Sequence, residues 1–304
     1  MSPPEFDAMS GQQKRNMALL ALLVGAIGIS LSPIFVRLSD VGPSVSAFYR
    51  TALAVPLLLI GPYFLPASPS RQSLVPATRR EGWMLILAGV FFALDLAFWH
   101  WSILLTSVAN ATLFPNLAPV FVTLTAWMWF GEKITKGFLL GLLVAIVGAA
   151  LIGGNSLGRA DSHIIGDLLG IVTAVFYAGY LLVVSRLRMS FGVRVIMIWS
   201  SGVSALLLLP LSWFTGATLQ PASLSGWIVL LALASISQVG GQGLIAYALA
   251  HLPVSFSSVG LLVQPALAAL FGYLILLEQV AFWQGVGIVT ILFGIYLAKR
   301  NAEL

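Results

Sequence analysis

Long apolar runs, each close to the length that crosses a lipid bilayer, constrain this chain more than any other feature. A helix needs about 20 consecutive apolar residues to span the hydrocarbon core. Of the 304 residues, 59% are hydrophobic and 8% are charged, whereas about 25% of an ordinary soluble domain is charged. A chain with so few polar groups cannot cover its surface with them, so lipid must be its main solvent.

Ten such runs follow one another, separated by charged residues or by Pro, Gly and Ser. Their approximate bounds are residues 17–38, 43–64, 82–105, 107–130, 136–153, 164–185, 194–214, 226–250, 254–277 and 281–299. The runs are continuous and lack the alternation of a lipid-facing barrel strand, which excludes a barrel. The first run is too long for a signal-peptide core. The sequence therefore predicts an all-α integral membrane protein with ten transmembrane helices.

The positions of Lys and Arg predict the orientation, because short cytoplasmic loops carry an excess of these residues. With ten spans, the side of the N-terminus receives twelve of the fifteen: Lys14, Arg15, Arg71, Arg79, Arg80, Lys133, Lys136, Arg186, Arg188, Arg194, Lys299 and Arg300. The other side receives Arg37 and Arg159, and Arg50 lies inside a span. Both termini are therefore predicted to be cytoplasmic, with residues 1–16 as a tail. The net charge of +5 follows from this topology, and no nucleic-acid partner is expected.

The chain also repeats itself at an offset of 146 residues. This shift aligns Pro119 with Pro265, Glu132 with Glu278, Gly141 with Gly287 and Gly148 with Gly294. Because each unit holds five spans, an odd number, the second unit is inverted relative to the first. Residues 17–155 and 163–300 are thus predicted to form two inverted five-helix repeats, the architecture of alternating access around a central site.

Two stretches carry a family resemblance. Residues 32–59, with Pro33, Phe35 and Arg50, resemble the first hairpin of EamA-type domains, and so do residues 119–148 and their later copy. These domains belong to the drug/metabolite transporter superfamily, within which the chain looks like YddG-type exporters of amino acids, aromatic ones included. The resemblance implies two EamA-like repeats over nearly the whole chain, cytoplasmic termini and a multi-pass protein of the cell inner (plasma) membrane.

Polar and aromatic side chains inside the spans are candidates for the substrate site, because an amide that faces lipid is costly. The predicted substrate-binding residues are Gln242, Tyr247, Gln264, Trp101, Tyr177 and Asn110. Gln242 and Tyr247 lie in QVGGQGLIAY, where three glycines clear space beside the amides. Such amides can instead bond between helices. Trp99 and Trp101 fit an interfacial aromatic belt as well as a substrate wall.

Arg50 and Asp95 are the only full charges predicted well inside the spans. An unpaired charge in hydrocarbon is expensive, so the leading hypothesis is that Asp95 is the structural counter-ion of Arg50. Proton coupling by Asp95, with His100 as an accessory, and contact with a substrate ammonium are the alternatives. Pro33, Pro119 and Pro265 interrupt spans and are predicted kinks or hinges.

The combined prediction is a secondary transporter that exports apolar or aromatic amino acids and related small metabolites by alternating access. The sequence lacks a phosphate-binding GxxxxGK[ST] loop for ATP. Export of drug-like organic cations is the alternative, and an intramembrane enzyme or a passive channel is less favoured. With no cysteine and three histidines away from metal-ligand spacing, neither a metal nor a cofactor is expected. The partners are a small-molecule substrate and the lipid bilayer, and a homodimer is left open.

Overall fold

The computed structural model describes residues 11–60, 73–105, 114–153, 164–214, 218–277 and 281–302. Helices make up the regular structure of these residues. They are α1 (Gly11–Ser30), α2 (Ser32–Leu38), α3 (Pro43–Ala52), α4 (Ala54–Ile60), α5 (Arg79–Leu105), η1 (Phe114–Leu117), α7 (Ala118–Phe130), α8 (Lys136–Gly153), α9 (Ile164–Leu187), α10 (Val193–Phe214), α11 (Leu224–Ala232), η3 (Leu233–Gln242), α12 (Gly243–Ala248), α13 (Val254–Gly260), α14 (Val263–Leu276) and α15 (Phe282–Asn301). The predicted all-α class is confirmed.

Eight helical segments of the described residues are long and apolar enough to cross a membrane. They match eight of the ten predicted spans. The predicted span 107–130 is described only from Phe114 onward, and the apolar helix Lys136–Ile152 is shorter than the other spans. The count of ten and the inversion of the repeats therefore remain predictions. Large apolar side chains such as Trp127, Leu140 and Phe293 are exposed on the outer faces, as lipid contact requires.

Prolines coincide with places where a span is broken into two helices. Pro33 and Pro119 lie in the first turns of α2 and α7, and Pro265 is the third residue of α14. Proline lacks the backbone N–H that would continue the preceding helix, but its fixed φ suits the first turn of a new one. The three predicted kinks are thus real breaks in the helices, and their use as hinges remains a prediction.

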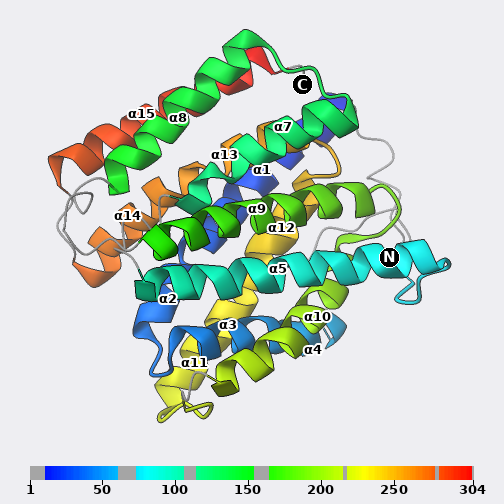
Figure 1. Cartoon of the computed structure of the whole chain (residues 1–304), viewed down its shortest axis with the longest axis vertical. Coiled ribbons are helices and arrows are strands. Elements are labelled where there is room, and N and C mark those ends of the chain that lie inside the picture. Colours follow the sequence, from blue (N-terminus) through cyan, green and yellow to red (C-terminus); the bar gives the residue numbers. More distant parts are fainter. Residues whose placement is uncertain are drawn as a thin grey trace.

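The packing joins the two halves of the chain. In the centre, α5 packs against α9 and α10, and α1 packs against η3 and α12 (Figure 1). At one end of the molecule α8 and α15 run side by side as a separate pair (Figure 1). Arg15 of α1 and Lys299 of α15 line one hollow, so α1 begins and α15 ends on the same face. We call it the terminal face. A chain whose first helix begins and whose last helix ends on the same face crosses the membrane an even number of times.

Glycine allows α8 and α15 to approach closely. A methyl group added at Gly148 would lie 2.6 Å from the backbone nitrogen of Ile291, and one added at Gly287 would lie 2.6 Å from the Gly148 carbonyl oxygen. Backbones this close gain van der Waals contact, which drives helix association in lipid. The glycines of the sequence repeat therefore hold two helices of the same chain together.

A carboxylate links the halves near the terminal face. Gly131, at a φ of 68°, ends α7 in the left-handed region that glycine tolerates, and Glu132 follows it. Its carboxylate accepts hydrogen bonds from the backbone nitrogens of Val254 and Ser255, at 3.0 and 3.4 Å, and from the Ser255 hydroxyl. One side chain thus joins the end of α7 to the start of α13.

We expect Gly148→Ala and Gly287→Ala to lower the stability of the purified protein. The added methyl group overpacks the α8–α15 contact, at a cost of about 1–3 kcal/mol, which exceeds the gain of about 1 kcal/mol from replacing helical Gly by Ala. The measurement is the thermal unfolding midpoint in detergent. The control is Gly285→Ala on α15, where a methyl group meets nothing within 4 Å and the midpoint should not fall. Equal midpoints for all three variants would contradict the packing account.

Candidate substrate site

A cavity of about 200 Å³ lies between the two halves of the chain. The first half contributes the end of α1 and parts of α2, α3, α5 and η1, and the second half contributes α9, the end of η3 and the start of α14. The predicted site residues on its wall are Arg50, Asp95, Tyr177, Gln242, Gln264, Pro33 and Pro265. Residues distant in the sequence therefore converge on one cavity.

Trp101 and Tyr247 lie elsewhere. Trp101 is 44% exposed and packs against Phe98, whereas Trp99 lines the cavity. Residues two apart on a helix point about 200° apart, so the two tryptophans face opposite sides. Tyr247 is buried beyond the cavity, with its ring 5.0 Å from the His251 ring. The structure thus gives Trp99 the place that the sequence assigned to Trp101.

Of the three remaining predicted site residues, only Pro119 has a side chain that the structure describes. Pro119 lines a second cavity, of about 20 Å³, which shares Tyr177 and Gln264 with the first. Asn110 and the His100 side chain fall outside the described residues. Sequence reasoning did not select Ser32, Phe92 or Thr173, which also line the cavity. Phe92 could have been found from its position three residues before Asp95, on the same helix face.

The Arg50 guanidinium is fixed at the cavity wall by neutral groups. Its Nε donates to the Gln238 amide oxygen at 2.9 Å and its Nη1 donates to the Ser32 hydroxyl at 3.1 Å. Its Cζ lies 5.5 Å from the centre of the Phe92 ring, a cation–π distance. Within the described part of the chain, the third nitrogen, Nη2, makes no hydrogen bond.

Asp95 lines the same cavity, and its carboxylate has no bonding partner among the described residues. Among the described residues it accepts no hydrogen bond and forms no direct ion pair with Arg50. No direct contact supports the predicted role of Asp95 as counter-ion, because Gln238 and Ser32 accept hydrogen bonds from the Arg50 guanidinium instead. A positive and a negative group are both left facing the space between them.

Among the buried side-chain atoms without a hydrogen-bond partner in the described residues, three belong to residues of the cavity wall. They are the Tyr177 hydroxyl, Gln242 Oε1 and Gln264 Nε2. Buried polar groups in folded proteins are nearly always paired, so each exception calls for an explanation. All three residues line one cavity, so a polar ligand bound there is an explanation for the hydroxyl, the acceptor and the donor.

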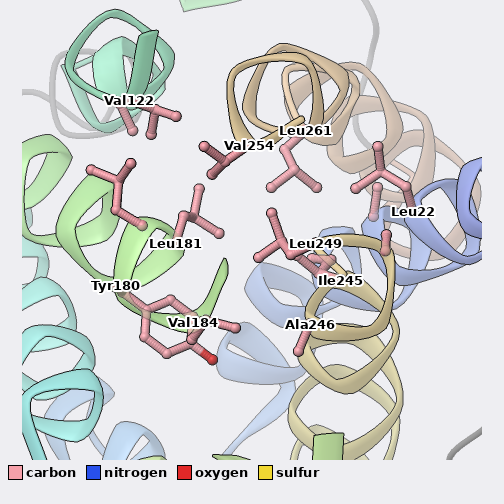
Figure 2. Packing of buried hydrophobic residues seen from close by; sticks show 14 of the residues in the cluster. Leu22, Val122, Tyr180, Leu181, Val184, Ile245, Ala246, Leu249, Val254 and Leu261 are labelled. Carbon is pink, nitrogen blue, oxygen red and sulfur yellow. The ribbon is translucent and has the colours of Figure 1, made fainter. Parts of the chain in front are cut away.

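An apolar cluster lies on the side of the cavity nearer the terminal face, and Figure 2 shows how its side chains pack. On α1, α9 and α12, its members lie about one or two turns nearer that face than the cavity residues of the same spans. Its labelled members are Leu22, Val122, Tyr180, Leu181, Val184, Ile245, Ala246, Leu249, Val254 and Leu261. Figure 2 shows Leu181, Val254, Leu249 and Leu261 of the second half directed at one another, with Leu22 and Val122 of the first half beside them. The cluster therefore closes the cavity toward the terminal face.

A buried cation lies beyond the cluster. Arg188, just after α9, donates from Nε to the Ala246 carbonyl at 3.0 Å and from Nη1 to the Phe191 carbonyl at 2.5 Å. Burial lowers the pKa of Arg188 to about 10, while the nearby Tyr247 opposes the shift. Arg188 therefore stays charged at neutral pH. Burial and the charges of Arg188 and Lys14 lower the pKa of His251.

A membrane-embedded bundle whose halves together line an amphoteric cavity is the arrangement of a small-molecule transporter. The chain belongs to the EamA-like transporter family, whose model matches residues 16–154 and again 164–300. The family thus agrees with the resemblance seen in the sequence. Both matched segments contribute residues to the cavity wall.

Individual proteins that are similar to this chain are also described as transporters. The chain is 29% identical over 193 residues to the pseudopaline exporter CntI of Pseudomonas aeruginosa, a match that covers 64% of each protein and so less than two thirds of the exporter. It is 26% identical over 291 residues to an uncharacterized transporter of Archaeoglobus fulgidus, covering 93% of this chain and 96% of the relative. A solved crystal structure superposes with a TM-score of 0.74 at 17% identity, covering 94% of this chain and 97% of that one, which shows the fold alone.

We expect Gln242→Met and Tyr247→Phe to separate these two predicted substrate residues. Gln242→Met removes a buried acceptor that has no hydrogen-bond partner among the described residues, so folded protein should be at least as stable while apparent substrate affinity falls roughly tenfold. Tyr247→Phe leaves the cavity wall unchanged, so affinity should stay within about twofold of wild type. Transport kinetics in liposomes and thermal unfolding are the two measurements. A loss of affinity confined to Tyr247→Phe would place the substrate away from this cavity.

Proposed function

We propose that this protein exports small zwitterionic metabolites, foremost amino acids with apolar or aromatic side chains, across the cell inner membrane. The observation that carries the proposal is the pair of opposite charges on one cavity wall. Arg50 Nη2 and the Asp95 carboxylate face the cavity without a bond to each other. A carboxylate and an ammonium on one small molecule satisfy both groups at once.

The rest of the wall supports the same class of substrate. Phe92, Trp99 and Tyr177 provide aromatic surface, and Gln242 and Gln264 provide an unpaired acceptor and donor. Mostly apolar pockets with a few convergent polar groups are typical of small-molecule sites. An apolar or aromatic side chain has a surface to pack on while the charged end of the molecule is held by Arg50 and Asp95.

The proposed transport cycle is alternating access between two faces. The apolar cluster and the Glu132 contacts close the cavity toward the terminal face, so this state suits exchange with the opposite side. For export, the cluster must open so that substrate enters from the cytoplasm. The exporter relative from Pseudomonas aeruginosa supports the direction of transport, and the Lys and Arg distribution supports a cytoplasmic terminal face.

Export of organic cations is the second candidate. The Asp95 carboxylate lies on a wall that also holds Phe92, Trp99 and Tyr177, and aromatic faces attract cations. A cation substrate would use Asp95 and the aromatic surface, whereas a zwitterion would use Arg50 in addition. The two candidates therefore make different predictions for Arg50.

We expect the wild-type protein in liposomes to exchange phenylalanine in counterflow better than phenethylamine, which lacks the carboxylate. Arg50→Gln should weaken phenylalanine transport roughly ten- to a hundredfold and leave phenethylamine little changed, because a hydrogen bond to a charged group is worth about 1.5–3 kcal/mol. Asp95→Asn should weaken both substrates. Size-exclusion profiles check that the variants are folded. If phenethylamine is the better substrate and Arg50→Gln affects neither, the protein is a cation exporter.

We expect cysteine labelling to place the terminal face in the cytoplasm. The native chain has no cysteine, so single replacements report one position each. Arg79→Cys and Gln220→Cys are suitable because both side chains are exposed. On intact cells, a membrane-impermeant maleimide should label Gln220→Cys, and it should label Arg79→Cys only after permeabilisation. Labelling of both from the same side would overturn the proposed topology.

A further inference from the structure

Gln238 does not line the cavity, but it contacts Arg50, which does. It lies in η3 and is fully buried, and its amide reaches both α3 and α10. The amide oxygen accepts from Arg50 Nε at 2.9 Å, and Nε2 donates to the Ser201 hydroxyl at 3.2 Å. Arg50 Nε can only donate, so the amide oxygen must face it, and the amide has one satisfied orientation.

The backbone that carries Gln238 is itself held in place. Residues Leu233–Gln242 form a π-helical segment, a rare conformation that is frequent at functional sites. The Ser237 hydroxyl donates to the Gly28 carbonyl at 2.7 Å, which ties the segment to α1. The same segment ends with Gln242 on the cavity wall. Its position therefore affects the substrate site through two glutamines.

The contacts of Gln238 and Ser32 determine how the Arg50 guanidinium is presented. They hold Nε and Nη1 from η3 and α2, one element from each half of the chain. A planar guanidinium held at two of its nitrogens cannot rotate freely, so the direction of Nη2 is set. A donor that is already oriented binds an anion with less loss of conformational entropy.

We propose that Gln238 is a positioning residue, oriented by Ser201, that directs Arg50 Nη2 toward the carboxylate of the transported molecule. This inference rests on the proposed function for its substrate and on the hydrogen bonds for its geometry. Gln238 does not touch substrate; it acts through Arg50. A residue that served only to fill the core would affect all substrates alike.

The test compares Gln238→Met with two serine variants on α10. Met keeps the length of the side chain but cannot accept from Arg50, and Ser201→Ala removes the partner of the amide. The matched control is Ser204→Ala, three residues later, because Ser204 is equally buried and donates to the Gly89 carbonyl at 2.8 Å, away from Arg50. Apparent affinities for phenylalanine and for phenethylamine are measured with each protein in liposomes.

Gln238→Met and Ser201→Ala should weaken phenylalanine roughly three- to tenfold and leave phenethylamine unchanged, so the ratio of the two affinities shifts. Ser204→Ala should leave the ratio at its wild-type value. Equal weakening of both substrates by Gln238→Met, or an equal shift of the ratio by Ser204→Ala, would overturn the positioning role.

A second readout needs no substrate and separates this inference from the proposed function. The Nε–H resonance of Arg50, identified by its loss in Arg50→Lys, should be protected from hydrogen exchange in the wild-type protein. Gln238→Met should shift this resonance and speed its exchange at least tenfold, because the acceptor is gone. Unchanged exchange would show that Gln238 does not hold Arg50, whatever the protein transports. A wild-type protein that prefers phenethylamine would instead refute the proposed function, and the resonance would still decide the geometry.

Discussion

The structure depends on a guanidinium that must stay charged inside a bilayer. Such a charge costs at least about 2.5 kcal/mol at the centre of a helix in lipid unless it is solvated by the protein or by water. Ser32, Gln238 and the Phe92 ring provide that solvation from α2, η3 and α5. These neutral partners anchor the charge without neutralising it. Arg50 can therefore be stably buried and still available to an anion, which a direct ion pair with Asp95 would prevent.

Two different kinds of contact join the halves of the chain. Toward the terminal face, side chains of both halves form an apolar cluster, and Glu132 joins α7 to α13 by hydrogen bonds. Side-chain contacts of this kind can separate when the two halves move. The α8–α15 pair is different, because its glycines bring backbones into contact and bind one helix of each half to the other. In the proposed transport cycle, this pair stays together while the cluster opens and closes.

Much of the fold could be predicted from the sequence because lipid leaves the backbone few choices: apolar runs of bilayer length must be helical. Asp95, Tyr177, Gln242 and Gln264 could be selected as site residues because polar groups avoid lipid. Their rotational position was harder to predict. Tyr247 and Trp101 do not line the cavity, since the direction of a side chain depends on helix packing and on local features such as the π-helical segment, which no residue pattern announced. The bond between Arg50 and Gln238 joins residues 188 positions apart and could not be read from local sequence.

The most direct measurement of the central claim is a structure of the protein with 4-bromophenylalanine, whose anomalous signal fixes the ring. If this ligand binds as proposed, its carboxylate lies within hydrogen-bond distance of Arg50 Nη2 and its ammonium faces Asp95. Its bromine then lies among the aromatic residues of the cavity wall. A ligand seated beside Tyr247, or one in this cavity whose carboxylate points away from Arg50, would contradict the account.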